Sequence, residues 1–209
     1  MMPRNNAAFV ALAAALSVLV PAASATYSYA GTGTQSPAYS SLYAQMEQSD
    51  VVREGAKVAK NVLYVFFDAN CFYCHLTWKA LQPYEKAGLQ VRWVPVAYQQ
   101  PSSAGRAAAI MQARDRVAAL RKNEVHYDRG RFVGGIAPLD KVTDVLATKL
   151  AANTQLMSRF GAPGTPALVW KDRAGQVRFK LGVPRLSELP AITGLPAQRV
   201  DDPELARFH

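Results

Sequence analysis

Residues 61–75, NVLYVFFDANCFYCH, decide the fold of this chain. Val62–Phe67 is an unbroken run of β-branched and aromatic residues, too short for a core helix, and it predicts a strand buried on both faces. After a short polar turn, apolar residues at helical spacing predict a helix that continues to Lys86. Cys71 and Cys74, the only cysteines in the sequence, therefore lie where a buried strand gives way to the first turn of a helix.

This position gives the two thiols different chemistry. Residues three apart on a helix lie on one face, with Cβ atoms about 5–6 Å apart, which is close enough to form a disulfide with small adjustment. Near the helix N-cap, orphan amides and the helix dipole favour negative charge, so the pKa of Cys71 should fall below its free value of about 8.5. Cys74 lies one turn further in and is more shielded. We expect Cys71 to attack a client disulfide and Cys74 to resolve the mixed disulfide.

The spacing of the cysteines favours redox chemistry over a structural disulfide. In an exported protein, two cysteines usually form a structural bridge. Such a bridge stabilises most when it closes a long loop, and this one would close only Phe72 and Tyr73. These two aromatic side chains, beside Cys71, are candidates for client contact, with a partly buried core position as the alternative.

The first 25 residues have the pattern of a cleavable secretory signal peptide. Arg4 is the only charged side chain in residues 1–25, and Ala7–Val20 is apolar but too short to span a bilayer comfortably. Ala23–Ala25 offers a small-x-small cleavage pattern, and an uncleaved anchor is the alternative. The sequence therefore predicts export to the periplasm, with a mature chain that begins near Thr26.

The basic composition does not predict nucleic-acid binding. The chain has 24 Lys and Arg residues, and removal of Arg4 with the signal leaves 23 against 15 acidic residues, a net charge of +8. These basic residues are scattered along the chain, without a run of four or an interleaved aromatic platform. We expect a basic surface that suits acidic clients or anionic membrane surfaces.

The remaining pattern predicts an α/β fold of the thioredoxin-like type. The order is strand, helix, strand, helical segment, hairpin and helix, with a parallel crossover first and an antiparallel edge last. After the first helix we expect a strand at Leu89–Val96, helices at Pro101–Arg121 and Leu139–Phe160, strands at Ala167–Trp170 and Gln176–Leu181, and a short helix at Leu186–Thr193.

The domain organisation predicted from these elements has four parts. They are a signal peptide at 1–25, a flexible tether with a short linker helix (Leu42–Ser49) at 26–60, the thioredoxin-like domain at 61–196 with a helical insertion at about 99–162, and an exposed C-terminal tail at 197–209.

A second motif, Gly164-Thr165-Pro166-Ala167, precedes the predicted hairpin. A proline directly before a buried strand is unusual unless it serves a special turn. In a thioredoxin-like fold, a cis-proline loop faces the CxxC motif at this point. We therefore predict a cis peptide bond between Thr165 and Pro166; the alternative is an ordinary Pro/Gly loop.

Together these motifs resemble the periplasmic thiol:disulfide interchange proteins of the DsbC/DsbG type, and the DsbG group most. The resemblance covers about residues 43–195 and is carried by the Phe66–Asp68 strand end, the Cys71–Cys74 motif and the Gly164–Ala167 loop, with further support from Trp78, Pro83, Ser102–Ile110 and Gly182–Pro184. It implies an enzyme without cofactor or metal, a nucleophile at Cys71, a resolving thiol at Cys74, and pairing of Thr165, beside Pro166, with client backbone. It also implies exported cysteine-containing clients and a membrane thiol reductant or oxidant as electron partner.

Two departures from that family affect the prediction. Phe72 stands where the family usually has Pro or Gly, and it supplies no positive charge between the cysteines. We therefore expect a reductase or isomerase-like role rather than that of a strong oxidant. Thr26–Lys60 is too short for the family's N-terminal dimerisation domain and linker, so we predict a monomer.

Three alternatives remain open. Cys71–His75 also fits the C-x-x-C-H haem attachment pattern, with His75 as proximal ligand and Met111 or Met157 as distal ligand. A zinc site would require His75, His126 and His209 to converge on the cysteines. A thioredoxin-like module could also bind partners in a secretion or conjugation apparatus without catalysis.

Overall fold

The computed structural model of the chain describes residues 37–209. The predicted signal peptide and the first part of the predicted tether lie outside these residues. Between Pro37 and His209, no helix is both long enough and apolar enough to cross a membrane.

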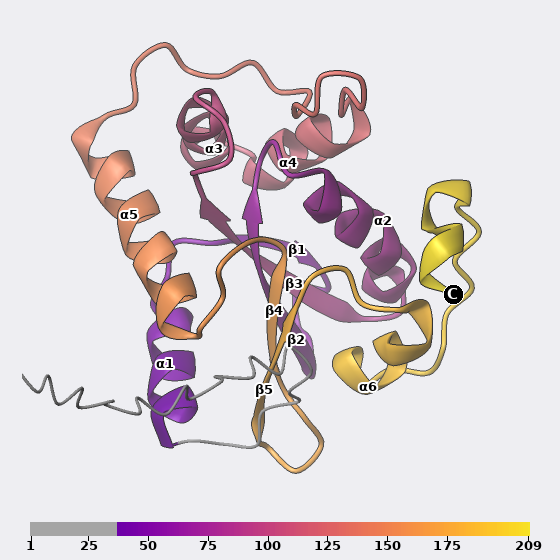
Figure 1. The fold of residues 1–209 in the computed structure, drawn as a ribbon. Helices are drawn as coiled ribbons and strands as arrows, with labels where there is room; N and C mark the ends of the chain where they lie inside the picture. Colours follow the sequence, from indigo (N-terminus) through magenta and orange to yellow (C-terminus); the bar gives the residue numbers. More distant parts are fainter. Residues whose placement is uncertain (1–36) are drawn as a thin grey trace, which may run out of the picture. The chain divides into compact units, whose positions relative to one another are not determined.

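Residues 37–209 form one five-stranded mixed sheet in the order β1-β3-β2-β4-β5 (Figure 1). The strands are β1 (Val52–Gly55), β2 (Asn61–Asp68), β3 (Leu89–Val96), β4 (Ala167–Lys171) and β5 (Val177–Leu181). Strands β2 and β3 are parallel, with Asn61 opposite Leu89 and Asp68 opposite Val96, while the other neighbouring pairs are antiparallel. The predicted crossover and antiparallel hairpin are both confirmed.

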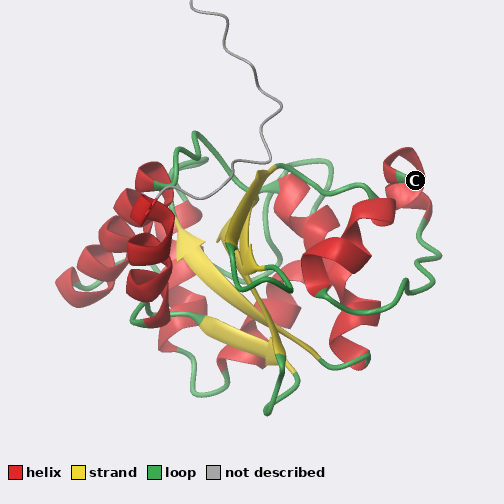
Figure 2. Ribbon diagram, turned by 90° about the horizontal axis from the view of Figure 1, so that it is seen from below, coloured by secondary structure: helices red, strands yellow, loops and turns green. Residues whose placement is uncertain are grey.

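Helices cover both faces of the sheet (Figure 2). The helices are α1 (Pro37–Glu47), α2 (Phe72–Lys86), α3 (Ser103–Gln112), α4 (Arg116–Val125), α5 (Asp144–Arg159) and α6 (Leu189–Thr193), with 3-10 turns η1 (Leu186–Glu188) and η2 (Pro203–Phe208). Successive residues of β2 serve opposite faces: Val65 packs with α2, α4 and α6, while Tyr64 and Phe66 pack with α1 and α5. This alternation within a wholly apolar run confirms a strand buried on both faces.

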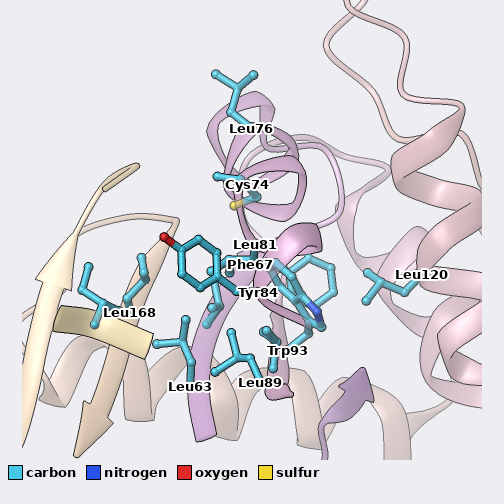
Figure 3. Packing of buried hydrophobic residues seen from close by; sticks show 14 of the residues in the cluster. Leu63, Phe67, Cys74, Leu76, Leu81, Tyr84, Leu89, Trp93, Leu120 and Leu168 are labelled. Atoms are coloured by element: carbon cyan, nitrogen blue, oxygen red, sulfur yellow. The ribbon is translucent and has the colours of Figure 1, made fainter. Parts of the chain in front are cut away.

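The face covered by α2 holds the core on which the cysteines rest. Trp93, Tyr84 and Phe67 are almost fully buried there, and Phe67 meets Trp93 edge to face at 5.7 Å between ring centroids. Figure 3 shows Cys74 on α2 as part of this same packed cluster. The helix that carries both thiols is therefore fixed by a rigid apolar base.

The folded domain begins earlier than residue 61. Strand β1 pairs antiparallel with β3, and α1 starts at Pro37 rather than Leu42. The part of the predicted tether at 37–60 is thus largely ordered structure, because Met46 and Tyr43 are buried against the sheet. The prediction missed β1 because its burial alternates over four residues only and includes the charged Glu54.

The helical insertion is divided differently from the prediction. The single helix expected at Pro101–Arg121 is two helices, α3 and α4, because Asp115 caps a new helix by accepting the Ala118 N–H at 2.9 Å. The helix expected from Leu139 begins only at Asp144, where Thr143 is the N-cap.

The predicted exposed tail is wrong. Residues 203–208 form η2, and Leu205 is fully buried in the cluster that packs on α2. Lys79 of α2 pairs with both Asp202 and Glu204, so charge pairs and an apolar anchor together hold this segment.

Candidate active site

Cys71 is the N-cap residue of α2, as its position in the sequence predicted. Its Sγ accepts a hydrogen bond from the Cys74 backbone N–H at 3.2 Å, so the sulfur fills the role that a Ser or Asp oxygen usually plays at a helix start. Both thiols are free and buried. The Cys71 sulfur therefore lies among the unpaired amides of the first turn, where a thiolate is stabilised.

The Thr165–Pro166 peptide bond is cis and lies directly across from Cys71. The Cys71 thiol donates to the Thr165 carbonyl oxygen at 3.5 Å, although the two residues are 94 positions apart in sequence. Pro166 is buried and Thr165 is partly exposed. The structure thus confirms the predicted cis bond and the predicted facing of the proline loop and the CxxC motif.

The two thiols are electrostatically unequal. The hydrogen bond from the Cys74 thiol lowers the pKa of Cys71. Hydrogen bonds from the Thr165 side chain and the Cys74 backbone amide act in the same direction, against the opposing effect of burial. Burial raises the pKa of Cys74 well above its usual range, and the neighbouring Cys71 adds to this. Cys71 is therefore the thiol that ionises first.

Asp68, at the end of β2, fixes the loops around Cys71. Its buried carboxylate accepts from the Ser103 hydroxyl at 2.8 Å and from the backbone N–H groups of Asn70, Tyr98 and Gln99 at 2.9, 2.9 and 3.1 Å. Four donors satisfy a buried charge that would otherwise be costly. One side chain thereby ties the CxxC turn to the loop after β3 and to the start of α3.

The insertion also braces the turn before Cys71. The Asn70 side chain donates to the Ser103 hydroxyl at 3.0 Å and accepts from the Gly134 N–H at 3.1 Å. The Asn70 backbone carbonyl accepts from the Tyr127 hydroxyl at 2.8 Å. A Cβ at Gly134 would come within 2.3 Å of the Ala69 carbonyl, so only glycine permits this close approach.

The aromatic pair between the cysteines divides into a packed and an exposed residue. Phe72 is partly buried and meets Phe132 of the insertion edge to face at 5.9 Å between centroids. Tyr73 is 50% exposed and Phe132 53% exposed, so both present ring surface to solvent near Cys71. The guanidinium groups of Arg129 and Arg207 lie 5.7 Å from the Phe72 and Tyr73 ring centroids.

His75 is buried between two carboxylates. Its Nδ1 lies 3.3 Å from Glu124 Oε2 and its Nε2 lies 3.6 Å from Glu204 Oε2. Both ring nitrogens thus face acidic groups. Met111 and Met157, the proposed distal ligands, belong to two other clusters of buried side chains. This arrangement does not favour the haem interpretation.

Over residues 37–209, no three His, Cys, Asp or Glu side chains are grouped as metal ligands.

The sequence analysis did not identify Tyr98 and Gln99 as site residues. The Tyr98 hydroxyl accepts from the Thr165 N–H at 2.7 Å and lies 3.0 Å from Thr165 Oγ1, to which the Gln99 amide donates at 3.3 Å. A signal was present: both residues lie in the loop just after β3, and the carboxyl ends of neighbouring parallel strands meet at one edge of the sheet.

The sheet order, the CxxC helix start and the facing cis-proline define a thioredoxin-like protein. The thioredoxin-like domain family matches residues 48–189, and the chain belongs to that family. This confirms the predicted fold class.

Within this class, the chain is similar to thiol:disulfide interchange proteins of the DsbC/DsbG type, as its motifs predicted. It is 31% identical over 159 residues to DsbG of Pseudomonas aeruginosa, a match that covers 76% of this chain and 60% of the relative. It is 30% identical over 162 residues to DsbG of Escherichia coli, covering 76% and 62%. The chain therefore spans about three fifths of the length of these relatives.

Among solved structures, ScsC of Proteus mirabilis in a transitional conformation is similar in fold. The TM-score is 0.57 at 25% sequence identity, and the match covers 75% of this chain and 77% of that one.

Proposed function

We propose that this protein is a thiol-disulfide oxidoreductase that exchanges disulfides with client proteins through Cys71 and Cys74. The observation that carries the proposal is the placement of the Cys71 sulfur 3.5 Å from the carbonyl oxygen of Thr165 at the cis-proline. The likeness to DsbG supports the same reaction class.

The geometry supports a reaction in two displacements. The Cys71 thiolate attacks one sulfur of a client disulfide, the client S–S bond breaks, and one client thiolate leaves, which produces a mixed disulfide. The Cys74 sulfur, after loss of its proton, then attacks the Cys71 sulfur and releases the second client thiol. Two electrons pass to the client, and the protein is left with a Cys71–Cys74 disulfide. A dithiol electron donor must reduce that disulfide before the next cycle.

The site supports a client docked as an extended segment. Thr165, beside Pro166, offers its backbone to the client, while Tyr73 and Phe72 flank the nucleophile with aromatic surface. Aromatic residues at such a position are suited to partner contact.

We favour a reductase or isomerase-like direction. The dipeptide between the cysteines has no charge of its own, and Arg129 over Phe72 is already paired with Glu204 at 2.5 Å. A reduction potential well below the roughly −120 mV of the strongest oxidants is the expected result.

We propose the periplasm as the location of this activity and exported cysteine-containing proteins as its clients, on the basis of the predicted signal peptide and the likeness to DsbG. We propose a membrane thiol reductant or oxidant as its electron partner.

The experiment compares the reduced protein with its Cys71→Ala variant in insulin reduction and in reactivation of scrambled ribonuclease. We expect the variant to lose activity in both assays while its circular dichroism spectrum stays unchanged. Equal activity in the two proteins would refute the proposal and favour a non-catalytic binding module.

A further inference from the structure

The backbone edge that should dock the client is already occupied by the chain itself. Thr165 has one N–H and one carbonyl group beside the cis-proline. The carbonyl accepts from the Cys71 thiol at 3.5 Å, and the N–H donates to the Tyr98 hydroxyl at 2.7 Å. Both groups that a client strand would use are therefore paired internally.

We infer that the Tyr98 side chain is a gate on this edge, meaning that it blocks client binding until it is displaced. Its hydroxyl accepts the hydrogen bond of the Thr165 N–H until a carbonyl oxygen from the client's extended backbone takes its place. This inference rests on the proposed function, since it concerns how the client of that reaction binds. In this inference, Tyr98 competes with the client for the Thr165 N–H and does not itself contribute a favourable contact to the client.

The surroundings of Tyr98 suit a side chain that moves while its backbone stays fixed. The Tyr98 N–H donates to the buried Asp68 carboxylate at 2.9 Å, which anchors the main chain. Its side chain is 45% exposed, so the ring has solvent on one side into which it can turn. The loop position is thus held independently of the hydroxyl contact.

Displacement also leaves no polar group without a partner. The Thr165 N–H exchanges the Tyr98 hydroxyl for a client carbonyl, and the released hydroxyl becomes hydrated. The Thr165 Oγ1 keeps the Gln99 amide donor at 3.3 Å. The client must nevertheless break an internal hydrogen bond that is more favourable than hydration of the same two groups, so removal of the hydroxyl should strengthen client binding.

The test measures binding without thiol chemistry. The probe is fluorescently labelled insulin B chain with its cysteines S-carbamidomethylated, titrated against the reduced protein and followed by anisotropy. We expect the Tyr98→Phe variant to bind this probe about threefold to tenfold more tightly than the unaltered protein, which is the range set by loss of one competing hydrogen bond.

Tyr127→Phe is the matched control. It removes a hydroxyl that donates to Asn70 at 2.8 Å, close to the same turn but away from the Thr165 N–H, and should not tighten binding. Unchanged or weaker binding by Tyr98→Phe would overturn the inference, because Tyr98 would then only brace the proline loop.

A second measurement uses a chain with Tyr98 intact, and so does not depend on how that variant folds. In a crystal structure of the Cys74→Ala variant joined to a client peptide by a mixed disulfide, the Thr165 N–H should donate to a client carbonyl. The Tyr98 hydroxyl should no longer accept the hydrogen bond of the Thr165 N–H. A Tyr98 hydroxyl still bonded to Thr165 in that complex would refute the gate alone. Failure to form any mixed disulfide would instead remove the proposed function on which it rests.

Discussion

At the scale of single residues, the site works by making two neighbouring thiols unequal. Cys71 takes the N-cap position and receives hydrogen bonds, whereas Cys74 is buried one turn further along the same helix. The largest contribution to the lowered pKa of Cys71 comes from the hydrogen bond that the Cys74 thiol donates. In the proposed mechanism, Cys74 would therefore have two roles: it would resolve the mixed disulfide, and its hydrogen bond lowers the pKa of Cys71.

The Cys74→Ala variant tests this coupling. It keeps the backbone N–H at position 74 but removes the thiol donor, so the pKa of Cys71 should rise. A hydrogen bond to a charged group contributes about 1.5–3 kcal/mol, so the ratio of thiolate to thiol at Cys71 should fall about tenfold or more at any given pH. The rate of alkylation of Cys71 by iodoacetamide, measured between about pH 5 and 10, gives the pKa of Cys71 in the unaltered protein and in the variant. Identical pH profiles for Cys71 in both proteins would contradict the coupling.

Glu85 gives a second prediction at this scale. Both of its carboxyl oxygens are buried without a hydrogen-bond partner. Burial raises the pKa of Glu85 from 4.5 to about 8, and repulsion by the neighbouring Glu54 carboxylate adds to this effect. A carboxyl with a raised folded-state pKa binds more protons when folded, so its contribution to stability falls as pH rises from about 4.5 to about 8.

The Glu85→Gln variant should therefore lose part of this pH dependence. Over that interval, the unaltered protein should lose at most about 1.4 kcal/mol of stability per pH unit through Glu85, and the neutral variant should not. Urea unfolding at pH 5.5, 7 and 8.5 measures the difference. Parallel stability curves for the two proteins would show that Glu85 does not titrate in this range.

At the scale of elements, sequence reasoning succeeded where the signal is local. Strands β2 and β3 are largely apolar runs, and the CxxC and Thr-Pro motifs are short and specific. The two strands, the cis bond between Thr165 and Pro166, and its position across from Cys71 could therefore be predicted.

The elements that sequence reasoning missed depend on distant partners. The buried Glu54 of β1 accepts from the indole groups of Trp78 and Trp93 at 3.1 and 3.0 Å, and nothing in the sequence near Glu54 indicates those partners. Tyr98 was missed although its position just after β3 placed it at the right edge of the sheet, because its partner Thr165 is 67 residues away.

The C-terminal turn η2 offers a prediction about elements. Leu205 is fully buried in the cluster that packs on α2, so the Leu205→Ala variant should lower the free energy of unfolding by about 2–5 kcal/mol. Arg199→Ala is the control, because the Arg199–Asp201 pair is exposed and should contribute at most about 0.5 kcal/mol. Urea denaturation measures both. A loss below about 1 kcal/mol for Leu205→Ala would mean that η2 does not stabilise the domain.

At the scale of the whole molecule, residues far apart in sequence converge on one edge of the sheet. The CxxC helix start, the loop after β3, the insertion and the cis-proline loop all contribute contacts there. Because the insertion and Asp68 hold these loops, the site is built on packed elements rather than on free loops. The monomeric state stays a prediction, which light scattering on the mature chain can decide.

The most direct test of the account is to trap the reaction at its first step. The Cys74→Ala variant, mixed with an oxidised client such as insulin, should accumulate a mixed disulfide that peptide mass spectrometry assigns to Cys71. The Cys71→Ala variant under the same conditions should form far less adduct, because the remaining Cys74 is buried with a raised pKa. An adduct at Cys74 in preference to Cys71, or no adduct at all, would contradict the assignment of Cys71 as the nucleophile.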